Sequence, residues 1–269
     1  EGQYNFAGMH RIMDLLGEVN IKVVLGTPTA APPIWLAQKH PEILPLDERG
    51  QRRCEGTRRA YCVNSAVYWE HSQRIVRALA GALGRHPQLI AWQIDNGLGA
   101  HNTAASFNPE TQRDWHAWLK AKYETIERLN DKLGTRFWGQ TVSQWEHVPM
   151  PRLTTATHNP ALVVDWMRFC SDTLVTYARM QANLLHELTP DIPVTHNFRA
   201  LSYDCDYFDL AEAVDFVAVD TNATIKDRAA ELACEIDLMR SLKKNGIRSP
   251  DGDYGFWVIE QKAGHVDWQ

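Results

Sequence analysis

Hydrophobic positions along the chain follow two spacings, one typical of amphipathic helices and one typical of short buried strands. Apolar residues three and four positions apart predict helices at residues 9–19, 68–83, around 110–133, 161–188 and 232–242. Continuous apolar runs of strand length lie at residues 21–26, 89–94, 194–198, 214–220 and 256–260. Short apolar strands separated by helices are typical of a parallel sheet covered by helices, so the pattern predicts an α/β fold.

Polar residues gather where the predicted strands end. They are Thr27, Asp95, Asn96, His196, Asn197, Asp220, Thr221, Asn222, Glu260 and Gln261. In a (β/α)8 barrel these strand ends meet on the face that carries the active site. A doubly wound sheet also fits the pattern, but no glycine-rich phosphate loop follows any strand. The barrel is favoured, although five strands are found and eight are needed.

Composition narrows the class of protein. The chain has 269 residues, a formal net charge of −5 and 44% hydrophobic residues, which are ordinary values for a globular domain. No basic patch indicates nucleic acid or an anionic membrane surface, and no apolar run reaches the ~18 to 20 residues of a membrane span. Five scattered cysteines fit a reducing compartment, so we expect a cytoplasmic protein.

Few residues stand out as candidates for chemistry. Glu260 follows a buried apolar run, where a carboxylate is costly to desolvate unless it is hydrogen-bonded or functional, and a structural ion pair is the alternative. Asp95 and Asn96 end another strand, but both are common turn residues. Arg58 lies in a charged loop that could simply be solvated. No H-E-x-x-H, paired cysteines or G-x-S-x-G supports metal or serine-hydrolase chemistry, and we expect no cofactor.

Eight segments together give the chain a specific resemblance. They read EGQYNF (1–6), VLGTPTAAPP (24–33), HPEILP (40–45), RRAYCVNS (58–65), AWQIDN (91–96), NPAL (159–162), PVTHNF (193–198) and FWVIEQ (256–261). Over nearly its whole length the chain resembles the catalytic barrel of glycoside hydrolase family 42, the β-galactosidases. The resemblance implies a (β/α)8 TIM-type barrel that is incomplete, with roughly strands three to seven present. It also implies that residues 1–269 form one partial barrel with no second domain.

The resemblance assigns expected roles to individual residues. Glu260 matches the nucleophile that follows the seventh strand, and Asn96 matches the asparagine that binds the sugar 2-hydroxyl beside the acid/base. Arg58 matches an arginine that holds the nucleophile or a sugar hydroxyl. Trp138 and Trp268 match walls of the galactose pocket, where an indole offers a flat apolar face.

Three departures from the family pattern bear on activity. Gly97 occupies the position of the acid/base glutamate, as a natural lesion, an engineered change or a sequence error. Asn222 stands where the family carries a tyrosine beside the nucleophile. The stretch 105–110 lacks the cysteine cluster of zinc-containing members, and Cys62 alone cannot complete a four-ligand site, so no zinc is predicted.

The expected function follows from these matches and departures. We expect a retaining β-galactosidase acting on terminal β-D-galactose, impaired because glycine replaces the acid/base. The alternatives are a catalytically silent barrel fragment that still binds galactosides, and a truncated product without a ligand. Family members form trimers, but the trimer-forming domain is not in this sequence.

Overall fold

The structure is a computed structural model that describes residues 2–199, 202–221, 229–243 and 255–261. The chain forms two compact units. The strand unit comprises residues 1–30, 70–98 and 175–269, and the helical unit comprises residues 31–69 and 99–174. The expectation of one partial barrel spanning residues 1–269 remains a prediction, since compactness alone does not define separate domains. The predicted roles of Asn222 and Trp268 fall outside the described residues.

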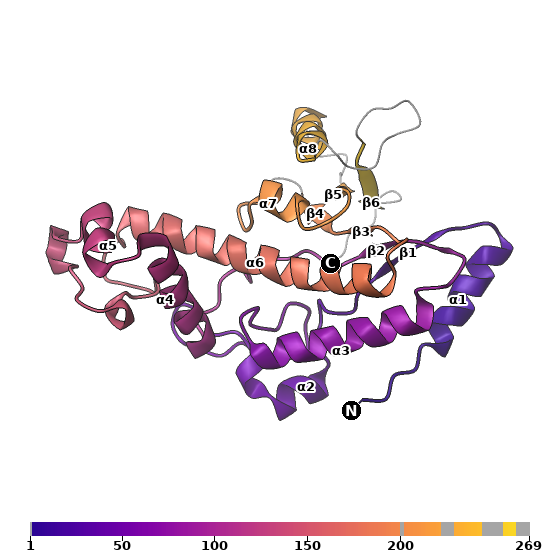
Figure 1. Cartoon of the computed structure of the whole chain (residues 1–269), viewed down its shortest axis with the longest axis horizontal. Coiled ribbons are helices and arrows are strands. Elements are labelled where there is room, and N and C mark those ends of the chain that lie inside the picture. The colour runs from indigo at the N-terminus through magenta and orange to yellow at the C-terminus, as the bar shows by residue number, and fades with distance from the viewer. Residues whose placement is uncertain (1, 200–201, 222–228, 244–254, 262–269) are drawn as a thin grey trace. The chain divides into compact units, whose positions relative to one another are not determined.

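All strands of the described chain belong to the strand unit and pair in parallel (Figure 1). They are β1 (Val23–Gly26), β2 (Leu89–Gln93), β3 (Val194–Thr195), β4 (Asn197–Arg199), β5 (Ala218–Thr221) and β6 (Trp257–Gln261). They form two three-stranded sheets, β1-β2-β3 and β4-β5-β6. Only His196 separates β3 from β4, so one stretch of chain pairs with β2 through β3 and with β5 through β4. Neighbours therefore follow chain order without reversal, as in a barrel and unlike a doubly wound sheet.

One helix precedes the first strand of this unit, the others connect successive strands, and two of these continue into the helical unit. They are α1 (Ala7–Glu18), α3 (Ala66–Leu83), α6 (Pro160–Leu188), α7 (Tyr207–Ala211) and α8 (Ala229–Ser241). Ala91 of β2, Ala218 of β5 and Phe216 just before β5 are buried and pack with Val24 and Trp257. Small residues beside large aromatic ones fill this core closely.

The helical unit is built around aromatic side chains. Its elements are α2 (Ile34–Lys39), η1 (Pro41–Ile43), α4 (Pro109–Tyr123), α5 (Ile126–Leu133), η2 (Phe137–Gly139) and η3 (Trp145–His147). Trp115 is fully buried, and its ring centroid lies 5.4 Å from those of both Trp166 and Phe169. The buried Asp165 carboxylate accepts hydrogen bonds from Lys122 and Tyr123, so the charge in this core is compensated.

The structure corrects the extent of three predicted elements. The helix expected around 110–133 is two helices, because Glu124 adopts φ 65° and Thr125 caps α5 by accepting from the Arg128 amide. The strand expected at 214–220 begins at 218, since the Asp215 carboxylate turns back to accept from the Val194 amide. The strand expected at 21–26 begins at 23.

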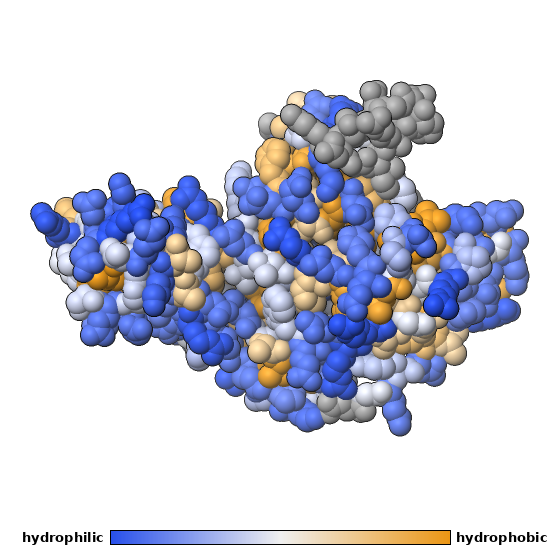
Figure 2. All heavy atoms as spheres, viewed as in Figure 1, coloured by the Kyte–Doolittle hydropathy of each residue, from blue (hydrophilic) through white to orange (hydrophobic). Residues whose placement is uncertain are grey.

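Hydrophilic residues cover most of the face shown in Figure 2, with apolar positions scattered among them. Large side chains such as Trp92 and Trp115 are buried, whereas others, such as Phe137 and Trp138, are exposed. None of the helices in the described ranges has the length and apolar character needed to cross a membrane.

Candidate active site

A hydrogen bond joins two of the residues that the sequence singles out. Asn96 follows β2 and Glu260 lies near the end of β6, and both side chains are partly buried. The Asn96 Nδ2 donates to Glu260 Oε1 at 3.1 Å. The fold therefore brings together an amide and a carboxylate that are 164 positions apart in the sequence.

The side chain of Asp95 is committed to a turn and does not share the surroundings of Asn96. The Thr29 hydroxyl donates to Asp95 Oδ2 at 2.8 Å, and the Asn96 amide donates to Asp95 Oδ1 at 2.8 Å. The Asp95 amide donates to Thr27 Oγ1 at 2.7 Å. Asp95 and Asn96 therefore have different side-chain partners, and strand alternation is not the cause. The strand ends at Gln93, and Asp95 is left-handed with φ 54°.

Side chains from the next strand hold the backbone after Asn96. The Gly97 amide donates to Asn197 Oδ1 at 2.8 Å, and the Asn197 amide group donates to Asp220 Oδ2 at 2.7 Å. His196 bonds to both ends of the turn, with Nδ1 at 2.8 Å from the Ile94 carbonyl and Nε2 at 3.2 Å from the Leu98 amide. A carbonyl can only accept, so His196 carries its proton on Nδ1. None of these bonds requires a side chain at residue 97.

Glu260 is the carboxylate in this cluster that is left for chemistry. Asp95 and Asp220 use their carboxylates to accept from hydroxyl and amide groups of the scaffold. Retaining hydrolysis of a glycoside needs two carboxyl groups about 5 Å apart, one as nucleophile and one as acid/base. Glycine at residue 97 has no carboxyl group, and Glu260 is the carboxylate here that contacts the Asn96 side chain.

In the helical unit, Arg58 and Arg59 have different environments. Arg58 is exposed, and its Nη2 lies 3.1 Å from His101 Nε2. Arg59 is only 2% exposed, and its guanidinium lies over the Tyr61 ring at 4.9 Å. Sequence reasoning singled out Arg58 and missed Arg59 as a buried cation. The apolar run that follows it, which is buried from Ala60 to Val63, was the available signal.

Trp138 presents an accessible ring. It is 66% exposed, adopts φ 53° and stacks on Phe137 with ring centroids 4.6 Å apart. It borders a cavity of about 690 Å³ that Leu133, Val148 and His158 also line. A volume of this size is typical of small-molecule sites, and an exposed indole suits a sugar face.

The residues present do not fit the structural zinc site of the family. The Cys62 sulfur is buried and lies 3.3 Å from the Thr111 hydroxyl, and burial raises the pKa of this thiol. A cysteine binds zinc as the thiolate, and the segment after the turn offers no second cysteine. A separate group of possible metal ligands, His10, Asp14 and His86, lies in the strand unit.

Comparison with known proteins identifies the family and the fold of the chain. The model of glycoside hydrolase family 42, described as β-galactosidase, matches residues 1–269. A β-galactosidase of Thermus thermophilus is 37% identical over 99% of this chain, and one of an Arthrobacter species is 38% identical over 100%. The solved β-galactosidase of Halorubrum lacusprofundi superposes on the whole chain with a TM-score of 0.91 at 32% identity.

The chain belongs to glycoside hydrolase family 42. Its strand unit is part of a TIM-type (β/α) barrel, which confirms the predicted fold class, and the described strands are fewer than the eight of a complete barrel. The chain spans 43% of the length of the Thermus thermophilus relative and 38% of the Arthrobacter relative.

Proposed function

We propose that this chain carries the nucleophile side of a retaining β-galactosidase site and lacks the acid/base side. The Asn96–Glu260 hydrogen bond is the observation that carries the proposal. It holds one carboxylate oxygen beside an amide, and an amide in that place can also bind a sugar hydroxyl. Glu260 is the proposed nucleophile, Asn96 the proposed ligand of the 2-hydroxyl, and Gly97 the position of the lost acid/base.

The missing group limits the chemistry in both steps. In the first step, a Glu260 oxygen forms a bond to the anomeric carbon while the bond to the leaving oxygen breaks. A phenolate can leave with that electron pair, whereas a sugar alkoxide needs a proton that residue 97 cannot give. In the second step, water needs a general base to attack the glycosyl ester. The ester should therefore accumulate when the leaving group is good.

Substrate recognition is proposed to involve Trp138 as a flat wall and an arginine from the loop before Tyr61. Arg58 is the residue that the family resemblance assigns to this role. Arg59 is a second candidate, because a buried guanidinium is a better fixed donor than an exposed one. Asn222 and Trp268, which the family resemblance assigns, complete the set of proposed substrate-binding residues.

A galactoside-binding protein without turnover is the second candidate function. The observation that favours it is the scaffold around Gly97, whose hydrogen bonds need no carboxyl group at that residue. Such a site would keep a shaped turn and Asn96 while having lost hydrolysis. Binding and covalent reaction therefore have to be measured separately.

A mechanism-based label tests the proposal. The protein is incubated with 2,4-dinitrophenyl 2-deoxy-2-fluoro-β-D-galactoside, whose leaving group departs without a proton, and the digest is analysed by mass spectrometry. We expect one fluorogalactosyl group on Glu260, and none on Glu260→Gln. Galactose binding without label would favour the binding protein, and a folded chain with neither would contradict both functions.

A further inference from the structure

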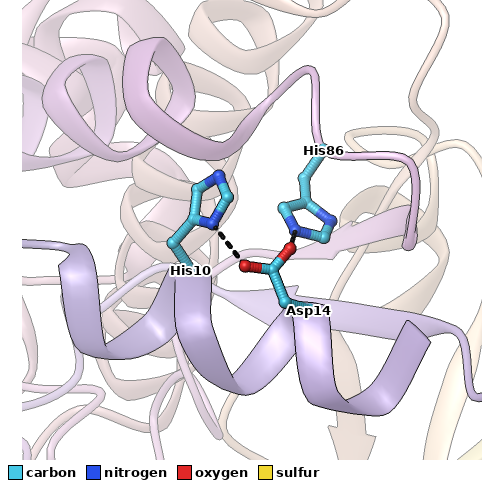
Figure 3. A group of neighbouring side chains, drawn as sticks. All are labelled: His10, Asp14 and His86. Atoms are coloured by element: carbon cyan, nitrogen blue, oxygen red, sulfur yellow. Dashed lines mark hydrogen bonds and ion pairs between the residues drawn. The ribbon is translucent and has the colours of Figure 1, made fainter. Parts of the chain in front are cut away.

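Three metal-ligating side chains converge at a place that the proposed galactosidase site does not use (Figure 3). His10 and Asp14 lie one turn apart on α1, and His86 lies between α3 and β2. His10 Nδ1 is 3.1 Å from Asp14 Oδ2, and His86 Nε2 is 3.2 Å from Asp14 Oδ1. The three ligand atoms all lie within 4.8 Å of one another.

We propose that His10, Asp14 and His86 bind a divalent transition-metal ion of the Zn²⁺ class. Two imidazoles and one carboxylate are a common ligand set for such an ion. Ligand atoms on a tetrahedral ion with bonds of about 2.0 Å stand roughly 3.3 Å apart. Whichever Asp14 oxygen ligates the ion lies 3.1 or 3.2 Å from one histidine nitrogen, and the other separations, all within 4.8 Å, would close on binding. Three protein ligands leave the fourth position to water.

Burial and charge favour an ion at this place. The His86 side chain is 3% exposed and forms a fixed floor, whereas the side chains of His10 and Asp14 are 53% and 46% exposed. An ion can therefore enter from solvent and meet a ligand that is already positioned. The Asp14 carboxylate lies between the two imidazoles and supplies the negative charge of the site.

Without a metal, the same groups form a chain of hydrogen bonds. The Gln88 amide donates to His86 Nδ1 at 3.2 Å, which places the His86 proton on Nε2, facing Asp14. A metal bound to His10 Nδ1 and His86 Nε2 would replace the protons that these nitrogens direct toward Asp14, and the bond between Gln88 and His86 would be given up.

The ion would tie α1 to the segment that leads into β2. Both lie in the strand unit, so the bound ion would stabilise that unit against unfolding. Asp14 is the central residue, because it contacts both histidines. Its replacement by asparagine keeps an oxygen to accept from His86 and removes the charge, so the variant should fold.

Titration with Co²⁺ and Zn²⁺ tests the proposal. The whole chain carries Cys54→Ser and Cys234→Ser, since those two exposed thiols could bind metal themselves. We expect one Co²⁺ per chain, with the visible absorption of tetrahedral coordination, displaced by one Zn²⁺ in calorimetry. His10→Ala and Asp14→Asn should each weaken binding at least tenfold, whereas His147→Ala, an exposed histidine of the helical unit, should not.

The result can overturn the proposal in two ways. Absence of stoichiometric binding to the folded parent would leave the three residues as a hydrogen-bonded group only. Binding that persists unchanged in His10→Ala and Asp14→Asn would place the metal elsewhere. Circular dichroism on each variant shows whether weaker binding reflects a lost ligand or a lost fold. The melting temperature should rise with Zn²⁺ in the parent and stay constant in Asp14→Asn.

Discussion

Two turns of this protein contain left-handed residues and are held in opposite ways. In the turn after β2, Asp95 and Gly97 adopt φ 54° and 61°. Hydroxyl groups from the loop after β1, and amide and imidazole groups from residues 196 and 197, bond to its backbone and to Asp95. In the turn of η2, Trp138 and Gly139 adopt φ 53° and 66°, but the Trp138 ring is 66% exposed.

The two turns differ in what holds them: the turn after β2 is a scaffold, and the η2 turn is a contact surface. The turn after β2 owes its shape to its surroundings, so it can keep that shape although residue 97 has no side chain. The η2 turn owes little to burial, so its ring is available to a ligand, and its replacement should affect binding more than folding. A buried network sets geometry, and an exposed aromatic residue supplies contact area.

Restoring the carboxyl group should give the largest effect. Gly97→Glu places a general acid on a turn that is already formed, and we expect hydrolysis of lactose to rise about 10²- to 10⁴-fold. The left-handed backbone costs the new residue about 1–2 kcal/mol of stability. Gly99→Glu, at φ 78°, is the matched control, because it adds the same charge to a left-handed glycine nearby. Equal rates in both variants would refute the assignment of residue 97.

Removing the side-chain amide of Asn197 should have the next largest effect. Asn197→Ala leaves the Gly97 amide without its acceptor and Asp220 without its donor, so unfolding free energy should fall by about 1–3 kcal/mol. Urea unfolding measures the change. The exposed Gln144→Ala is the control, expected within about 0.5 kcal/mol of the parent. Equal stability of the two variants would mean that the network does not hold the turn.

The two neighbouring arginines sharpen the contrast between buried and exposed groups. Arg59→Ala removes a buried cation and its contact with the Tyr61 ring, and we expect it to lower stability by about 1–3 kcal/mol. Arg58→Ala should change stability by less than about 0.5 kcal/mol. Galactose affinity, measured by calorimetry on both variants, then shows which arginine binds the sugar. If both variants bind as the parent does, neither residue has that role.

The smallest effect on stability should come from Trp138. Its indole is mostly exposed, so Trp138→Ala should leave unfolding within about 0.5 kcal/mol of the parent. Loss of a flat apolar contact should weaken galactoside binding several-fold, and Trp138→Phe should restore part of it. Unchanged affinity in Trp138→Ala would remove this residue from the proposed sugar site.

The sequence predicted the strand segments and the longer helices because their burial has a clear period, but it did not predict the short helices α2 and α7. The five apolar runs mark the described strand segments, and the family motifs led to both Asn96 and Glu260. The predicted ends of helices and strands were wrong where a single polar residue overrides the hydrophobic pattern. Glu124 breaks a helix by adopting a positive φ, and Asp215 delays a strand by bonding to the Val194 amide.

Groups that meet only through tertiary structure were beyond sequence reasoning. His86 is 72 positions from Asp14, and no metal-binding spacing links the two. The bonds that hold the turn after β2 likewise span up to 102 positions. Arg59 looked like part of a charged loop until burial distinguished it from Arg58. Sequence motifs can identify individual residues, whereas hydrogen-bond networks between residues far apart in the sequence are found only in the folded structure.

Turnover of an aryl β-galactoside with and without azide tests whether Glu260 acts as a nucleophile at a site without an acid/base. Azide is a small anion that can enter the space beside Gly97 and attack the sugar bound to Glu260 without a general base. We predict that azide accelerates turnover and that β-galactosyl azide is the product. The Glu260→Gln variant should give no such product. Hydrolysis of lactose at a normal rate without azide, or no turnover by folded protein in either condition, would contradict it.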